Sequence, residues 1–149
     1  MASVKRINET FFIEKSDRML FATGNGLVTY SPEDNTIYQS DLIPQKATHG
    51  IVCNKDKNIW VSTNSGIVSL DSAYNYRLSY DRFSGLEVLE YSDGACCYDK
   101  ISDKIIFGGI NGLTIIGENE TSQSYIPDIH ITNFIQNNTF THISSKMKN

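Results

Sequence analysis

The sequence predicts an all-β fold, and an internal repeat is the main reason. Three segments align without gaps, namely RMLFATGNGLVTY at 18–30, NIWVSTNSGIVSL at 58–70 and KIIFGGINGLTII at 104–116. Each segment has an apolar run, a short turn with glycine and a second apolar run, which is the pattern of two strands joined by a tight turn. This pattern excludes solenoid repeats built from helices.

The turns of the three segments are predicted to be structural. Glycine, and asparagine before it, tolerate the positive φ angles that short hairpin turns need. A glycine-rich phosphate cradle would have to open a helix, whereas here the chain continues into a strand. We therefore predict structural turn residues, and no ligand contacts, at Asn25, Gly26, Asn64, Gly66, Asn111 and Gly112.

Further apolar runs extend each segment to a four-stranded antiparallel meander. Innermost strands are expected upstream, at TFFIE, GIVCN and ACCYD, and outer strands that alternate polar and apolar residues are expected downstream. The predicted strands are 10–14, 19–23, 26–30 and 36–40 in the first unit, 49–54, 58–63, 66–71 and 76–82 in the second, and 94–99, 104–109 and 112–117 in the third. No helix of three turns or more is expected within 10–117.

The spacing and the burial pattern predict β-propeller blades. The turn glycines are 40 and 46 residues apart, close to the roughly 40 to 50 residues of a blade. The first two strands of each unit are apolar at consecutive positions, so both of their faces need cover, whereas the outer strands alternate. Blades that pack face to face provide this cover near the ring axis. The fold prediction is therefore a partial β-propeller of three four-stranded antiparallel blades, at about 1–45, 46–84 and 85–125.

The repeat stops after the third unit. Residues 118–124 are polar, and the alternation IPDIHITNFI at 126–135 then predicts the first strand of a following domain. The tail at 136–149 is polar and is expected to be poorly ordered at its end. Three blades are fewer than the roughly 4 to 8 that close a ring. We therefore expect the chain to be part of a larger protein.

The repeats resemble the short propeller repeats in the sensor regions of two-component regulators. The match is closest in the third unit, FSGLEVLEYSDGACCYDKISDKIIFGGINGLTIIGEN, which is similar to the last blade of these sensors. The resemblance covers roughly residues 10–135. The sequence departs from the family pattern at Val88 and Leu89, where polar residues are usual, and at Ser92, where asparagine is usual.

The resemblance implies the periplasmic sensor region of a hybrid histidine kinase, of the kind that detects glycan-derived oligosaccharides in gut Bacteroidetes. In this family a proline-led strand begins an immunoglobulin-like sandwich after the propeller, and the strand led by Pro127 is similar to it. Residues 126–149 are thus expected to hold a linker and the first, truncated strand of a sandwich. The family's kinase, phosphoacceptor histidine and DNA-binding parts have no counterpart in this segment.

The composition argues against several other partners. The formal net charge is −4 and there is no Lys/Arg cluster, so nucleic acid is not expected as a partner. No apolar run reaches the roughly 18 to 20 residues of a membrane span, and the first twenty residues lack the features of a signal peptide. We predict no membrane contact by this segment.

The cysteines and histidines predict neither a metal site nor a cofactor. The three histidines are far apart, with ordinary loop or strand positions expected for them, and the cysteines have no CxxC spacing. Cys53, Cys96 and Cys97 lie in apolar runs and are expected to be small core residues, because free cysteine behaves as a buried hydrophobe.

Three acidic residues cluster in one predicted loop. Glu87, Glu90 and Asp93 could form paired carboxylates for acid–base catalysis. Neither a nucleophile with a neighbouring base nor a set of metal ligands accompanies them. We therefore predict no catalytic residue. Glu90 matches a position of the sensor family, and the resemblance implies that it fixes the loop by hydrogen bonds.

Aromatic and basic side chains offer candidates for sugar contacts. Trp60 could stack on a sugar, but its aligned positions are Leu20 and Ile106, so a core position is expected. Arg82, Tyr91 and Tyr98 remain candidates. The ligand-binding residues are unknown from the sequence.

Three functional hypotheses follow. The first is a binding module, part of a sensor propeller that helps to hold a glycan-derived ligand, with the remaining blades of the parent propeller as partners and self-association through open edges. The second is a propeller enzyme similar to streptogramin lyase, which would need a histidine base and a metal near the ring axis; His49 is the only histidine within the repeats. The third is a structural, truncated product without activity.

Overall fold

The computed structural model describes residues 6–13, 18–41, 43, 47–88, 90–117, 133–136 and 139–142. Within these ranges, every regular element is a strand except one short 3-10 helix, η1 (Arg82–Ser84). The first sheet contains β1 (Ile7–Ile13), β2 (Arg18–Thr23), β3 (Gly26–Ser31) and β4 (Thr36–Gln39). The second contains β5 (Thr48–Cys53), β6 (Ile59–Thr63), β7 (Gly66–Leu70) and β8 (Tyr76–Tyr80), and the third contains β9 (Tyr91–Asp99), β10 (Lys104–Gly109) and β11 (Gly112–Gly117).

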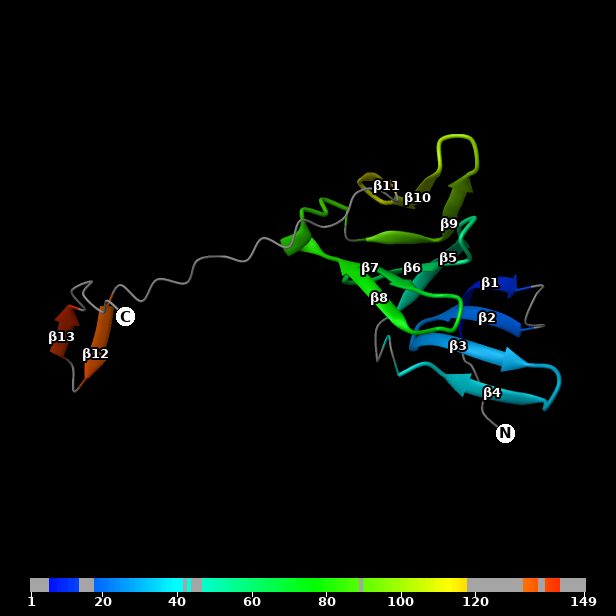
Figure 1. Cartoon of the computed structure of the whole chain (residues 1–149), viewed down its shortest axis with the longest axis horizontal. Helices are drawn as coiled ribbons and strands as arrows, with labels where there is room; N and C mark the ends of the chain where they lie inside the picture. The colour runs from blue at the N-terminus through cyan, green and yellow to red at the C-terminus, as the bar shows by residue number, and fades with distance from the viewer. Residues whose placement is uncertain are drawn as a thin grey trace.

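The three sheets are antiparallel meanders that lie side by side. In each sheet the strands pair in chain order, and the second sheet lies between the first and the third (Figure 1). The prediction of an all-β, partial propeller-like fold is thereby confirmed. One detail differs from the prediction of three four-stranded blades, because the third sheet has three strands within the part of the chain that the structure describes. Residues 118–132 lie outside the described residues, so a fourth strand of this sheet stays a prediction.

The strand ends differ from the prediction where the backbone is irregular. β1 starts at Ile7 rather than at residue 10, and β9 starts at Tyr91 rather than at residue 94. Both strands shift register near their start, and the extra residues of a bulge interrupt the alternation by which a strand is recognised. β8 ends at Tyr80 rather than at residue 82, because the Asp81 carboxylate caps η1 by accepting the N–H of Ser84 (3.0 Å).

The turn glycines have the backbone conformation that these hairpins need. The φ angles are 121° at Gly26, 130° at Gly66 and 142° at Gly112, a region that strains residues with a Cβ atom. The asparagines before them do not share it. Among the described residues other than glycine, positive φ occurs at Asn35, Lys57, Tyr74 and Asp103.

Two threonines brace the first two turns. The Thr23 hydroxyl donates to the carbonyl of Gly26 (2.6 Å) and accepts the N–H of Asn25 (3.2 Å). Thr63 makes the same pair of bonds in the second sheet, donating to the Gly66 carbonyl (3.0 Å) and accepting an N–H two residues on (3.1 Å). A threonine three residues before the turn glycine is therefore a further part of the repeat, and it satisfies backbone groups at the turn.

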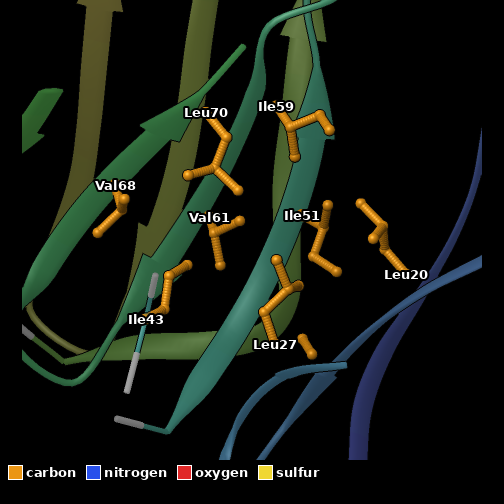
Figure 2. Close-up of a cluster of buried hydrophobic side chains, with 9 residues drawn as sticks. Leu20, Leu27, Ile43, Ile51, Ile59, Val61, Val68 and Leu70 are labelled. Carbon is orange, nitrogen blue, oxygen red and sulfur yellow. The ribbon is translucent and has the colours of Figure 1, made fainter. Parts of the chain in front are cut away.

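Two apolar clusters hold the stack together. The first lies between the first and second sheets (Figure 2). Its buried members are Leu20, Ala22, Leu27, Ile43, Ile51, Ile59, Val61, Val68 and Leu70. The second cluster lies between the second and third sheets, and its buried members are Val52, Trp60, Ile67, Val88, Tyr91, Ile105, Phe107 and Ile116. The hydrophobic effect acts on both faces of the middle sheet.

Among the described sheets, only the middle one has inner strands that are covered on both faces. Every residue of β6 and β7 is buried. In the first sheet Phe12 is 49% exposed, and on the outer face of the third sheet Cys97 and Ile115 are exposed on either side of their register partner Ile106. Within this chain, cover on both faces is therefore reached in the second unit alone, because each end sheet has a neighbouring sheet on one side only.

The stack has a direction. Leu20 of β2 faces the second sheet, and its repeat counterpart Trp60 of β6 faces the third. One position earlier in the repeat, Ile59 faces back to the first sheet and Ile105 faces back to the second. Each sheet thus presents one set of repeat positions to the sheet that follows and another set to the sheet that precedes it. By this rule Ile106 lies on the outward, following face of the third sheet.

A separate hairpin follows the sheets in the sequence. β12 (Asn133–Gln136) pairs antiparallel with β13 (Thr139–His142). The predicted strand at 126–135 overlaps β12, although residues 126–132 lie outside the described residues. The second strand of the hairpin was not predicted, because its sequence is polar. The sandwich domain stays a prediction. Among the described residues, no helix is long and apolar enough to cross a membrane.

The core predictions succeed for the tryptophan and fail for one cysteine. Trp60 is 2% exposed, and its ring stacks on that of Tyr80 with centroids 6.3 Å apart. Cys53 and Cys96 are half-buried free thiols, but Cys97 is exposed, so its prediction as a core residue was wrong. The apolar run around Cys97 gives no sign in the sequence that the outer face of β9 is left without a neighbouring sheet in this chain.

Candidate functional site

One end of the stack gathers the irregular segments. The starts of the innermost strands β1, β5 and β9 pair with the ends of β2, β6 and β10 through Ile7–Thr23, Thr48–Thr63 and Tyr91–Gly109. The β2–β3, β6–β7 and β10–β11 turns therefore lie at this end, and so does the loop that leads into β9. We call this end the strand-start face.

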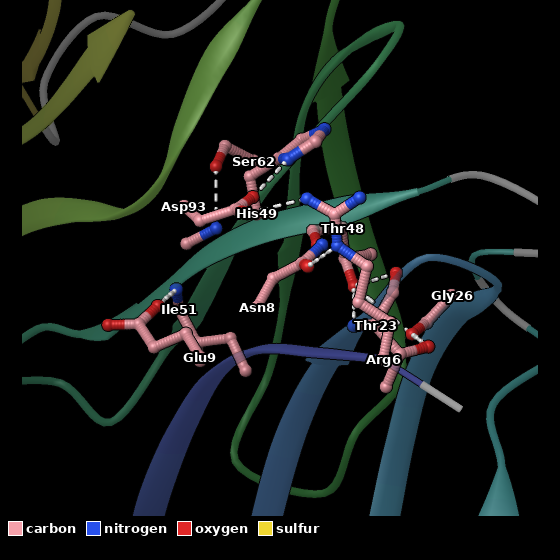
Figure 3. Close-up of polar contacts among 11 residues, drawn as sticks. Arg6, Asn8, Glu9, Thr23, Gly26, Thr48, His49, Ile51, Ser62 and Asp93 are labelled. Carbon is pink, nitrogen blue, oxygen red and sulfur yellow. Dashed lines mark hydrogen bonds and ion pairs between the residues drawn. The ribbon is translucent and has the colours of Figure 1, made fainter. Parts of the chain in front are cut away.

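An inner polar cluster lies where β5 packs between β1 and β9, and its members are Arg6, Asn8, Glu9, His49 and Asp93 (Figure 3). The Asp93 carboxylate contacts Nδ1 of His49 at 2.8 Å and the Arg6 guanidinium at 3.2 Å. The Asn8 amide donates to the backbone carbonyl of Thr48 at 2.7 Å. Side chains from all three sheets thus meet at this point.

A bulge in β9 places Asp93 in the cluster. Cys96 pairs with Phe107 and Tyr91 pairs with Gly109, so residues 92–95 lie opposite the single residue 108. Gly94 has φ of 68° within this bulge. Bulges re-aim side chains and often lie next to functional sites. The hydrogen bond with His49, followed by the one with Arg6, holds the pKa of Asp93 below its usual value.

Glu9 connects the three innermost strands. Its carboxylate accepts the backbone N–H of Ile51 in β5 and lies 3.5 Å from the Cys96 sulfur in β9. Burial raises the pKa of Glu9, and the Ile51 hydrogen bond opposes that shift in part. Burial and the nearby Glu9 charge raise the pKa of the Cys96 thiol to about 12. Cys96 therefore stays a thiol near neutral pH and is not an activated nucleophile.

A second feature of the strand-start face is a cavity of about 470 Å³. We call it the loop cavity, because most of its wall is the loop between β8 and β9. It is lined by Arg82, Leu86, Glu87, Val88, Glu90 and Asn111. Its volume falls within the roughly 300 to 1,000 Å³ of small-molecule sites, and its wall combines apolar side chains with a guanidinium, two carboxylates and an amide.

The wall of the loop cavity is held by specific contacts. Val88 is buried against Gly109, where an added Cβ would come within 2.6 Å of the Val88 side chain and 2.4 Å of the Glu90 carbonyl oxygen. The same Glu90 carbonyl accepts the N–H of Ile110 (3.0 Å). Gly109 takes the place of the bracing threonine in the other two turns, and this exchange leaves room for the loop to pack on the β10–β11 turn.

The structure separates the three acidic residues that the sequence groups together. Glu87 and Glu90 line the loop cavity, whereas Asp93 lies in the inner polar cluster. Glu90 was predicted to fix the loop by hydrogen bonds, and the loop bond that the structure shows is made by its backbone carbonyl, which accepts the Ile110 N–H. Among the described residues, no group of three or more His, Cys, Asp or Glu side chains could hold a metal ion.

The three candidate sugar contacts also lie in different places. Arg82 lines the loop cavity. Tyr91 is buried, and its hydroxyl is bonded to that of Thr114 (3.0 Å). The Tyr98 hydroxyl donates to Asp103 at 2.6 Å near the β9–β10 turn, at the other end of the stack.

Sequence reasoning missed most of the inner polar cluster. Arg6, Asn8 and Glu9 come just before or within an apolar run and had no predicted role in a site. His49 was predicted at an ordinary loop or strand position and was considered only as the base of the alternative enzyme. A usable signal was present, because Asn8-Glu9 and Thr48-His49 both place polar residues at the start of an innermost strand that is otherwise apolar.

Comparisons with known proteins give a consistent result. The structure is similar to the extracellular domain of BT3049 from B. thetaiotaomicron, described as a hybrid two component system, with a TM-score of 0.71 and 27% identity over 93% of this chain and 20% of that one. The extracellular domain of BT4673, from the same organism, shares the fold with a TM-score of 0.59 and 20% identity, over 94% of this chain and 18% of that one.

A curated relative is Histidine kinase P4 from Formosa agariphila, which is 26% identical over 113 residues, or 74% of this chain and 8% of the relative. No protein-family model matches the chain. The chain spans about a fifth or less of the length of each of these proteins. By its fold and its sequence, the chain is similar to the extracellular domains of hybrid two-component systems.

Proposed function

We propose that the chain is part of the periplasmic ligand-sensing region of a hybrid two-component regulator, and that the ligand is a glycan-derived oligosaccharide. The likeness to the extracellular domain of BT3049 carries the sensor part of this proposal. In the parent protein, the histidine kinase lies outside this segment, and the segment itself catalyses no reaction.

The strand-start face supports a polar, uncharged ligand. The loop cavity offers hydrogen-bond donors on Arg82 and Asn111 and acceptors on Glu87 and Glu90, beside apolar contacts from Leu86 and Val88. Asn111, expected from the sequence to be a structural turn residue without ligand contacts, thereby takes a second role in this proposal. Sugars present many hydroxyl groups, each of which donates and accepts, around apolar C–H faces. A wall of mixed donors and acceptors with apolar patches therefore matches a saccharide in kind.

Further blades of a longer chain are the proposed partners. The chain spans 20% of the length of the BT3049 domain. Phe12 and Ile37 on the outer face of the first sheet, and Leu113 and Ile115 on the outer face of the third, are large exposed apolar side chains. Such faces favour cover by neighbouring sheets. Without those sheets, we expect the chain to self-associate.

Calorimetry with a panel of glycan oligosaccharides tests the proposal. We expect the complete extracellular region of the parent protein to bind one of them, and this chain alone to bind none tighter than about 1 mM, or about −4 kcal/mol. A partial propeller supplies only part of the hydrogen-bonding groups around a ligand, and each unmatched buried group costs about 1 to 3 kcal/mol. Failure of the complete region to bind any saccharide would remove the glycan assignment.

One observation favours a second function, an enzyme similar to streptogramin lyase. His49 lies where the innermost strands meet, with its Nδ1 held by Asp93 at 2.8 Å, and a carboxylate can orient a histidine for general-base catalysis. The test is lyase activity of wild type and His49→Ala. Turnover that the substitution abolishes would support this second function and contradict the first.

A further inference from the structure

An aromatic side chain stands fully exposed beside the loop cavity. Phe83 of η1 is 99% exposed, and its chain neighbour Arg82 lines the cavity. Scattered exposed apolar residues are common on proteins. A phenylalanine whose chain neighbour lines a polar cavity is a more specific arrangement, since it can bring a flat apolar surface next to a set of hydrogen-bonding groups.

The backbone that carries Phe83 is anchored at both ends of η1. The Asp81 carboxylate accepts the Ser84 N–H at 3.0 Å and the Ser84 hydroxyl at 3.1 Å. Gly85 ends the turn in a left-handed conformation with φ of 89°, and the Leu86 N–H returns to the Asp81 carbonyl at 3.1 Å. The backbone position of Phe83 is therefore set before any ligand arrives, which reduces the backbone entropy lost on binding.

We infer that Phe83 and the loop cavity form a subsite for one uncharged pyranose or furanose ring. The Phe83 ring packs against the apolar C–H face of the sugar, as amphipathic ligands favour at aromatic surfaces. Arg82, Glu87, Glu90 and Asn111 bond its hydroxyl groups. This inference rests on the proposed function and adds to it the place and the charge class of the ligand.

The charges of the lining select against acidic sugars. Two carboxylates, on Glu87 and Glu90, and one guanidinium, on Arg82, line the cavity, so its lining carries a net negative charge near neutral pH. A uronic acid placed there would meet two like charges within one cavity, and like charges at short range repel in a partly desolvated site. We therefore expect neutral saccharides to bind more tightly than oligogalacturonates.

The experiment measures weak binding to this chain directly. Saturation-transfer NMR titrations use xylotetraose, cellotetraose, mannotetraose and arabinotetraose as neutral probes and trigalacturonate as the acidic probe, up to about 20 mM each. The variants are Phe83→Ala, Glu90→Gln and the control Ile101→Ala. Ile101 is 98% exposed in the β9–β10 turn, so it matches Phe83 in exposure but lies at the other end of the stack.

We expect one neutral probe to bind with a millimolar Kd, and Phe83→Ala to weaken it at least about fivefold, while Ile101→Ala leaves it unchanged. Glu90→Gln should reduce the preference for the neutral probe over trigalacturonate about threefold or more, because it removes one negative charge from the cavity. Tighter binding of trigalacturonate, an equal loss in Ile101→Ala, or no binding of any probe to this chain overturns the subsite.

The same variants separate this inference from the proposed function. If the complete extracellular region binds a neutral oligosaccharide and Phe83→Ala leaves that Kd unchanged, the subsite is wrong while the sensor proposal stands. If the region binds no saccharide at all, the glycan assignment itself fails. If Phe83→Ala instead removes binding of a protein partner and no saccharide binds, the surface is a docking site and the inference is overturned.

Discussion

Replacing Gly66 by valine tests the turn geometry most sharply, because two separate effects meet at this residue. The glycine has φ of 130°, which only glycine adopts readily. In addition, an added Cβ would lie 2.0 Å from the carbonyl oxygen of Tyr80 and 3.1 Å from the Cα of Asp81. The residue therefore has neither the conformation nor the space for a side chain.

The loss of stability in Gly66→Val is estimated from two contributions, backbone strain and steric overlap. Backbone strain at such a φ costs about 1 to 3 kcal/mol. The overlap with backbone atoms forces the β6–β7 turn away from the end of β8, and overpacking of this kind costs about 1 to 3 kcal/mol more. We expect Gly66→Val to lower the free energy of unfolding by about 2 to 6 kcal/mol, or the midpoint temperature by about 2 to 4 °C per kcal/mol for a chain of this length.

Two other glycines distinguish the effect of backbone strain from the effect of steric overlap. Gly112 has φ of 142°, but an added Cβ would meet only the Val88 side chain at 3.7 Å, so Gly112→Val carries strain without overlap. Gly24 has neither a positive φ nor any neighbouring atom within 4 Å, so Gly24→Val should stay within about 0.5 kcal/mol of wild type. Asn64→Ala removes only a 3.4 Å side-chain contact and should also be mild.

Thermal and urea unfolding of the four variants give the result. The expected order of destabilisation is Gly66, then Gly112, then Gly24 and Asn64. Equal losses at Gly66 and Gly112 would show that the approach of the Tyr80 carbonyl does not limit the turn. A Gly66→Val protein as stable as Gly24→Val would refute the assignment of the turn conformation altogether.

Three further predictions concern titration, thiols and assembly. Burial raises the folded-state pKa of Glu9 above its usual value of 4.5. The stability of wild type relative to Glu9→Gln should therefore be greatest below the unfolded-state pKa of 4.5 and should fall as the pH rises through the raised folded-state pKa. Urea unfolding from about pH 4 to pH 8 measures this stability difference, and an advantage of wild type that grows with pH contradicts the prediction. Thiol labelling should modify exposed Cys97 long before Cys96, whose pKa is about 12, and equal rates would argue against the buried position. Light scattering at tens of micromolar should show oligomers that Ile106→Lys with Ile115→Lys reduces, whereas a stable wild-type monomer would count against open apolar faces.

The regular part of the fold is encoded locally and was predictable. Strands such as β6 and β7 are continuous apolar runs on either side of a glycine turn, and their ends agree with the prediction within a residue. The irregular starts of β1 and β9 were not predictable, because a bulge has no periodicity. Burial of the end sheets also depends on what lies next to them, which a strand's own sequence does not state. Cys97 shows this.

The candidate site was less predictable because it combines residues that are distant in the sequence. Glu9 and Cys96 are 87 residues apart and meet only because β5 packs between their strands. The grouping of Glu87, Glu90 and Asp93 by proximity in sequence was misleading, since the β9 bulge turns Asp93 toward His49. Only the loop cavity is formed mainly by residues that are close together in the sequence, and the sequence analysis had singled out its two acidic residues, Glu87 and Glu90.

The direction of the stack has a consequence for symmetry. Both interfaces within the chain join the following face of one sheet to the preceding face of the next, and the two free faces are one of each kind. Copies of the chain that join by the same contact must therefore assemble head to tail, in a heterologous arrangement, and not as a two-fold dimer with identical patches in contact. Each added copy presents the same two free faces again. Such an assembly ends only when the rotation per copy closes a cyclic ring, and otherwise it grows as an open helix.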